Sequence, residues 1–131
     1  MKKFIEINNL KKVFGYGQNA VHAFGPIDLN INQGEFISFL GPSGCGKSTL
    51  MLMIAGLLSN TTGHVSIGGA KVEEPKTDVG IMFQDSTLVP WRTVKGNIEL
   101  QLELRGEKKE KYQDKIDELL SSVHMKDFAD R

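Results

Sequence analysis

The chain has 131 residues, a length typical of a single domain with one core. Its 16 basic and 16 acidic residues leave no positive excess of the kind that nucleic-acid-binding proteins show, so we expect no nucleic-acid partner. The longest apolar run, Leu50–Leu58, is shorter than the about 20 residues of a membrane-spanning helix, and Met1–Glu6 turns polar before an apolar signal region could form. Cys45 is the only cysteine, which excludes an internal disulfide and suits a reducing cytoplasm.

The first half of the chain contains three predicted strands and one helix. Apolar and polar residues alternate at Phe4–Leu10 and Ile27–Ile31, which predicts two half-buried strands joined through a turn. Glu35–Leu40 is more continuously apolar and predicts a buried strand that leads directly into Gly41. Lys47–Leu58 predicts a helix, and because its residues are apolar nearly all round, we expect it to be buried on most sides.

The middle of the chain contains two further predicted strands. His64–Gly69 predicts a short strand followed by a turn. Val79–Phe83 is apolar and predicts a second buried strand, which ends at Gln84. Asp85–Arg92 contains a proline and predicts a loop, so a polar glutamine and a loop follow the buried strand directly.

Two helices are predicted in the last part of the chain. Thr93 is a suitable N-cap for a helix through about Arg105, because apolar residues recur there every four positions. Apolar residues also alternate between Ile98 and Leu104, so a strand stays open as the alternative. Beyond Gly106 an apolar stripe among charged residues predicts an amphipathic helix, and the stripe consists of Tyr112, Ile116, Leu119, Leu120 and Val123.

A phosphate-binding loop lies between the predicted strand and the predicted helix. The pattern G-x-x-x-x-G-K-[ST] is satisfied in the required context by Gly41, Pro42, Ser43, Gly44, Cys45, Gly46, Lys47 and Ser48, followed by Thr49. Glycines let the backbone approach phosphate oxygens with its N–H groups, and the helix N-terminus adds to the attraction. The bland alternative is a Gly-rich turn that binds nothing. We expect the loop to hold the triphosphate of ATP or a close relative.

Each polar residue of the loop has an expected task. Lys47 should reach the β- and γ-phosphates as a point charge, and the Ser48 hydroxyl should bind Mg²⁺. Thr49 should bond the phosphate region through its backbone or hydroxyl. The motif by itself does not choose among GTPases, small kinases and transport ATPases, although the N-K-x-D string of GTPases is absent from the sequence.

The words around the loop carry a more specific resemblance. G-P-S-G-C-G-K-S-T-L, preceded by I-N-Q-G-E-F and followed by G-I-M-F-Q-D, closely resembles the ATP-binding subunits of ABC transporters, over essentially the whole chain. The resemblance implies an α/β P-loop NTPase fold with an antiparallel β portion near the N-terminus, and ATP with Mg²⁺ as cofactors. It also implies that the protein is cytoplasmic and peripheral on the inner face of the cell membrane.

Two further site residues follow from the resemblance alone. The aromatic residue that stacks on adenine in the family corresponds to Phe14, and Tyr16 is a nearby alternative for the same role. The non-functional alternative is that Phe14 is a core residue at the end of its strand. The family glutamine that contacts Mg²⁺ and the attacking water falls at Gln84. The catalytic residues are therefore expected to be Lys47 and Gln84, and the metal ligands Ser48 and Gln84.

Partners are also implied by the resemblance. The loop 86–94 is rich in apolar and aromatic residues, the composition expected where a partner docks, and the resemblance implies that this partner is a membrane-embedded permease subunit. The alternative is that Leu88 and Trp91 fold back onto their own core. The sequence of the loop resembles that of ATP-binding subunits from importers of nitrate, sulfonate and taurine. In the intact family, two ATP-binding subunits form a dimer.

Several family motifs do not occur in this sequence. The L-S-G-G-Q signature, the strand that ends in paired acids and the switch histidine are all absent. We therefore expect residues 1–131 to be the N-terminal portion of an ATP-binding domain, truncated before the signature and second-motif segments. Whether such a chain hydrolyses ATP, or only binds it weakly or acts as an interaction module, is left open.

Overall fold

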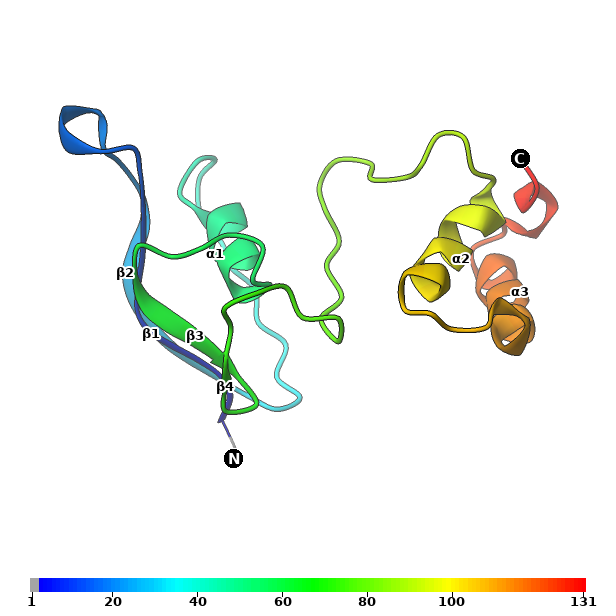
Figure 1. The fold of residues 1–131 in the computed structure, drawn as a ribbon, viewed down its shortest axis with the longest axis horizontal. Helices are drawn as coiled ribbons and strands as arrows, with labels where there is room; N and C mark the ends of the chain where they lie inside the picture. Colours follow the sequence, from blue (N-terminus) through cyan, green and yellow to red (C-terminus); the bar gives the residue numbers. More distant parts are fainter. Residues whose placement is uncertain (1–2) are drawn as a thin grey trace. The chain divides into compact units, whose positions relative to one another are not determined.

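The computed structural model describes residues 3–131, which form two compact units. Among the described residues, the first unit is 3–81, and the second is Met82–Arg131 (Figure 1). Each unit has its own arrangement of helices or strands, and each is described by itself.

The first unit is built on a four-stranded antiparallel sheet of β1 (Lys3–Phe14), β2 (Val21–Asn32), β3 (Thr62–Ile67) and β4 (Ala70–Lys71), in the order β2-β1-β3-β4. The strands β1 and β2 form a long hairpin through a short 3₁₀ turn at Gly17–Asn19. The strands predicted near the N-terminus and at His64–Gly69 are therefore confirmed. The first two are longer than predicted, since β1 is Lys3–Phe14 and β2 is Val21–Asn32.

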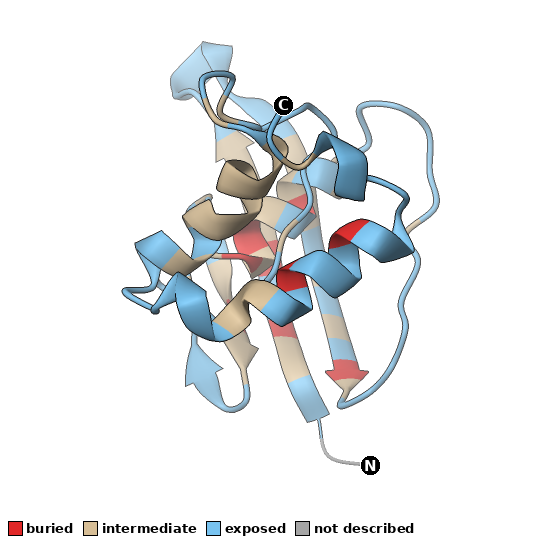
Figure 2. Cartoon of the chain, turned by 90° about the vertical axis from the view of Figure 1, so that its right-hand side faces the viewer, coloured by how far each residue is buried: buried red, intermediate tan, exposed pale blue. Residues whose placement is uncertain are grey.

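The core of the first unit lies between this sheet and α1, Lys47–Ile54. Figure 2 shows the buried residues, in red, on the strands and on the helices. The core side chains come from β1, α1, β3 and the segment after β4: Ile7, Leu10, Leu50, Met53, Val65 and Val72.

The helix α1 is shorter and less buried than expected. It ends at Ile54 rather than at Leu58, because Gly56 adopts a positive φ of 74° and turns the chain away. Met51 and Leu57 are 46% and 45% exposed, so the prediction of burial on most sides is wrong.

The two predicted buried strands Glu35–Leu40 and Val79–Phe83 are also wrong, since both segments are irregular. Glu35 closes a turn back onto Asn32, whose N and Nδ2 donate to its carboxylate at 2.7 and 2.8 Å and so lower the pKa of that carboxyl. An apolar run states only a preference for burial, whereas a strand needs a hydrogen-bonding neighbour. Neither segment pairs with another strand among residues 3–131, and Phe36, Leu40 and Met82 are 94%, 92% and 96% exposed.

The second unit is helical. Thr93 Oγ1 accepts a hydrogen bond from Gly96 N at 3.0 Å, so the predicted helix is confirmed and the strand alternative is wrong. The amphipathic helix is confirmed at Ile116 and Leu120, which are buried, but Val123 is exposed. The elements are α2, Val94–Leu104; a 3₁₀ turn, Lys109–Tyr112; α3, Gln113–Ser122; and a 3₁₀ turn, Lys126–Phe128.

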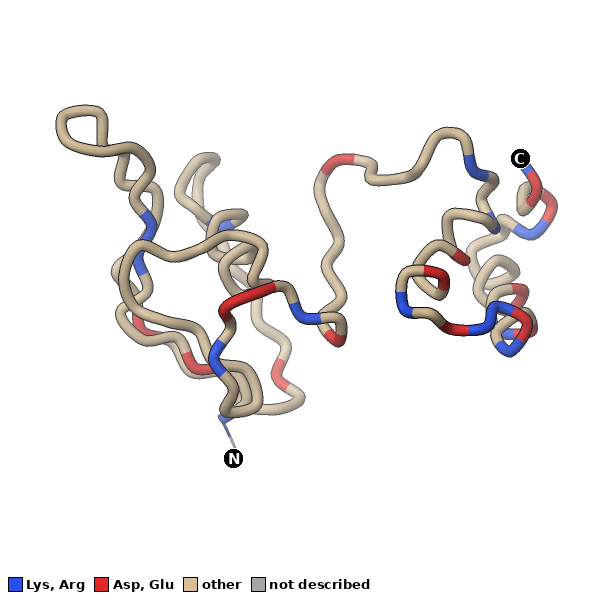
Figure 3. The backbone as a smooth tube through the Cα atoms, viewed as in Figure 1, with Lys and Arg blue, Asp and Glu red and all other residues tan. Residues whose placement is uncertain are grey.

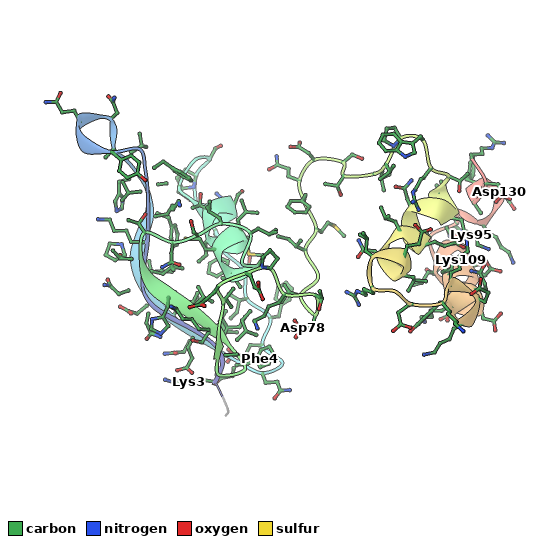
Figure 4. All side chains as sticks on the ribbon, viewed as in Figure 1. Lys3, Phe4, Asp78, Lys95, Lys109 and Asp130 are labelled. Atoms are coloured by element: carbon green, nitrogen blue, oxygen red, sulfur yellow. The ribbon has the colours of Figure 1, made fainter. Side chains whose placement is uncertain are left out.

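Charged residues of both signs cover the segment between α2 and α3 (Figure 3). Arg92 pairs with Glu103 at 2.8 Å, and Lys109 pairs with Glu99 at 3.5 Å (Lys109 is labelled in Figure 4). None of the helices described in residues 3–131 has the length and apolar character that a bilayer crossing requires.

Candidate nucleotide-binding site

The predicted phosphate loop is an open turn that ends at the N-terminus of α1. Gly46 is the N-cap, and no side chain caps the helix, so the first N–H groups of α1 have no partner within the helix. The positive end of the helix dipole therefore faces the loop. An anion at this position would receive both the free N–H groups and the favourable field.

Gly46 is required by its surroundings as well as by its conformation. Its φ of 95° lies in the left-handed region that side chains disfavour. A Cβ atom there would lie 2.7 Å from the carbonyl oxygen of Ala23 and 2.7 Å from Cδ2 of Phe24. The backbone of the loop thus packs directly against β2, and this close approach fixes where α1 begins.

The side chain of Lys47 points back into the loop. Its Nζ donates to the carbonyl oxygens of Gly41 and Pro42, at 2.7 Å each, and lies 3.5 Å from Sγ of Cys45. These contacts hold the ammonium group among the loop atoms, where a phosphate would meet it. Phosphate oxygens are stronger acceptors than amide carbonyls, so a bound triphosphate could take over these donors.

The remaining polar and glycine residues of the loop are mostly open to solvent. Ser43, Gly44, Cys45 and Ser48 are exposed, and Thr49 is half-buried. The Ser48 hydroxyl suits Mg²⁺, which prefers oxygen ligands and completes its shell with phosphate oxygens and water. Within the described part of the chain, no group of three or more His, Cys, Asp or Glu residues could hold a metal ion.

Phe14 and Tyr16 line a cavity at the end of β1. The cavity has a volume of about 400 Å³, and it is lined by Lys12, Val13, Phe14, Gly15, Tyr16, Asn60 and Thr61. Phe14 is 45% exposed and does not belong to the core cluster, so the alternative that it is a core residue is wrong. Tyr16 is 95% exposed. Both aromatic rings are therefore accessible to a planar base.

Gln84 belongs to the second unit, and its side chain is exposed. The phosphate loop belongs to the first unit. The role of Gln84 at Mg²⁺ and at the attacking water thus stays a prediction.

The loop after Gln84 presents apolar side chains to solvent. Leu88 and Trp91 are 70% and 84% exposed, so the alternative that both fold back onto the core is wrong. A mainly apolar cavity of about 360 Å³ lies beside this loop, within the second unit, and Leu88, Val94, Ile98 and Met125 are among its lining residues.

Sequence reasoning missed two residues, one that holds the loop carrying Leu88 and Trp91 and one that contacts the ring of Phe14. The Asn97 side chain accepts from Val89 N at 2.7 Å and donates to the carbonyl oxygens of Val89, Arg92 and Thr93 at 3.1, 3.2 and 3.0 Å. Lys12 contacts the ring of Phe14. A helical asparagine and a strand lysine look like ordinary surface residues, so only their spacing from Thr93 and Phe14 could have signalled them.

Comparisons with known proteins show which family the chain resembles. A family model described as ABC transporter matches residues 24–131. The chain is 36% identical to the taurine import ATP-binding protein TauB of Ruegeria pomeroyi, over 86% of this chain and 42% of that protein. It is 42% identical to the bicarbonate transport ATP-binding protein CmpC of Synechococcus elongatus, over 100% of this chain and 20% of that protein.

A solved structure has the same fold. It is the dimeric structure of a post-hydrolysis state of an ATP-binding cassette bound to ADP and Pi, which matches with a TM-score of 0.83 at 30% identity, covering 97% of this chain and 60% of that one. The fold is therefore that of a P-loop NTPase. The chain belongs to the ABC transporter family, and it spans less than half the length of the two relatives named above.

Proposed function

We propose that this chain binds MgATP and forms the nucleotide-holding part of an ABC importer ATPase. The observation that carries the proposal is the position of Lys47 Nζ among the loop atoms, bonded to Gly41 and Pro42, at the uncapped start of α1. Positive charge and free N–H groups meet there, and both favour a polyphosphate.

The residues divide the work of binding among themselves. Lys47 neutralises charge on the β- and γ-phosphates, and the N–H groups of the loop cradle the phosphate oxygens. Ser48 and Gln84 would hold Mg²⁺, which bridges phosphate oxygens and offsets the charge that develops during phosphoryl transfer. The base would stack on Phe14, at the cavity that ends β1.

The wider assembly also belongs to the proposal. Leu88 and Trp91, with the apolar cavity beside them, would meet a membrane-embedded permease subunit at the inner face of the cell membrane. A second ATP-binding subunit would complete the dimer. The names of the relatives, which refer to taurine and bicarbonate, favour uptake of a small anion, in the same class as nitrate and sulfonates.

Calorimetry with MgATP tests the binding step. Lys47→Ala should lower the affinity for MgATP at least about tenfold, because hydrogen bonds to charged groups contribute about 1.5–3 kcal/mol each. Lys76→Ala, which removes a lysine of the same unit outside the loop, is the matched control and should bind as the wild type does. Equal ATP affinity in Lys47→Ala and wild type, with both chains folded by circular dichroism, would contradict the proposal. Measuring turnover on the same samples separates binding from hydrolysis.

A further inference from the structure

Lys12 makes two contacts that connect the end of β1 with the segment after α1. Its Nζ lies 4.9 Å from the centroid of the Phe14 ring, and it donates to the carbonyl oxygen of Ser59 at 2.6 Å. Lys12 and Phe14 are two residues apart on β1, whose register with β2 shifts between Lys12 and Val13, and the two side chains meet across this irregularity. The ammonium group is thus held between a ring and a backbone carbonyl.

The backbone around this contact is fixed by Thr61. Thr61 N donates to the carbonyl oxygen of Lys11 at 2.8 Å, and Thr61 Oγ1 accepts from Val13 N at 2.9 Å and donates to Val13 O at 3.2 Å. The last β1–β3 pair is Lys11 with Thr62, so Thr61 continues the support of β1 beyond the ladder. The backbone of Phe14 is held by its pairing with Val21 of β2, and the orientation of its ring depends on side-chain contacts.

A cation over one face of an aromatic ring has two consequences. It is attracted by the negative face of the ring, which restrains the ring against rotation. It also covers that face, so that a planar base can stack only on the other one. Both Lys12 and Phe14 line the cavity of about 400 Å³ at this place.

We propose that Lys12 is a positioning residue for the purine base of the nucleotide: it holds the Phe14 ring at the cavity and so selects the ring face on which the base stacks. The inference rests on the proposed binding of ATP and adds a residue that acts through Phe14. Lys12 is expected to strengthen recognition of the base and to leave recognition of the phosphates unchanged.

The test compares two ligands on the 131-residue chain by calorimetry: MgATP, and inorganic tripolyphosphate with Mg²⁺, which has no base. Lys12→Met keeps the length of the side chain but removes the charge, and it should weaken ATP about two- to five-fold, as expected for one exposed cation–π contact. Lys12→Arg keeps the cation and the donors, so it should restore ATP affinity. Lys11→Met, at the neighbouring position outside the cavity, is the matched control. Tripolyphosphate affinity should stay the same in all of these variants.

A double-mutant cycle shows whether Lys12 acts through the ring. In a Phe14→Leu background, Lys12→Met should produce no further loss of ATP affinity. Equal ATP affinity in Lys12→Met and wild type would overturn the inference while leaving ATP binding intact. A parallel loss of tripolyphosphate affinity would overturn it as well, because Lys12 would then act on the phosphates. A wild-type chain that binds neither ligand would refute the proposed function, and the inference with it.

Discussion

Asn97 braces the loop that carries Leu88 and Trp91, and its removal should loosen the second unit measurably. Its amide makes four hydrogen bonds to the backbone between Val89 and Thr93, at 2.7 to 3.2 Å. The two Nδ2 protons share three carbonyl acceptors, so about two or three bonds are effective, each contributing about 0.5–1.5 kcal/mol. We expect Asn97→Ala to lower the free energy of unfolding of this unit by about 1–4.5 kcal/mol.

The single tryptophan makes the assay local. Trp91 lies in the braced loop, so urea unfolding followed by its fluorescence reports on the second unit. Gln101→Ala, at an exposed position of α2, is the matched control and should change stability by less than about 0.5 kcal/mol. Asn97→Asp should also destabilise, because a carboxylate would face three carbonyl oxygens. If Asn97→Ala unfolds at the same urea concentration as Gln101→Ala, the bracing role is refuted.

Two further predictions concern the base and the partner. Phe14→Ala should weaken the binding of ATP by about 1–3 kcal/mol, which is the contribution of one base–aromatic stack. Tyr16→Ala should weaken ATP binding less. A larger loss of calorimetric affinity for Tyr16→Ala would show that the wrong aromatic residue had been assigned. Photoreactive residues placed at Leu88 or Trp91 should crosslink to the permease subunit in an assembled transporter, because both side chains are exposed. Crosslinks found only within the chain itself would remove the docking role.

The parts of the structure that were predictable are those fixed by local patterns. Alternation along β1 and β2, the cap at Thr93 and the stripe containing Ile116 and Leu120 all depend on residues close in sequence. Such signals act within one element, where period and capping decide the conformation. The loop pattern was recognisable for the same reason, since its glycines and its lysine have a fixed spacing, and its binding of phosphate stays a prediction.

The errors arose where the conformation depends on distant partners. Phe36 and Leu40 were assigned to a strand from hydrophobicity alone, and no described strand pairs with them. The contacts of Lys12 with Ser59 and of Val13 with Thr61 join residues 47 and 48 positions apart, which no local pattern specifies. Asn97 bonds to backbone only four to eight positions away, and it was missed because nothing in the residue type shows which backbone groups an amide side chain contacts.

The phosphate loop keeps its shape although the segment before it is irregular, and the reason lies on the helix side. Lys47 and Ser48 are the first residues of α1, whose Leu50 and Met53 are 2% and 3% exposed in the core against β1 and β3. Gly46 packs against Ala23 and Phe24 of β2. Helix packing and this close backbone approach therefore place the side chains of Lys47 and Ser48, whereas Glu35–Leu40 contributes no strand pairing. The sheet thus positions the loop that would hold the triphosphate, through β1 and β2. The Phe14 cavity lies at the end of β1 in the same sheet.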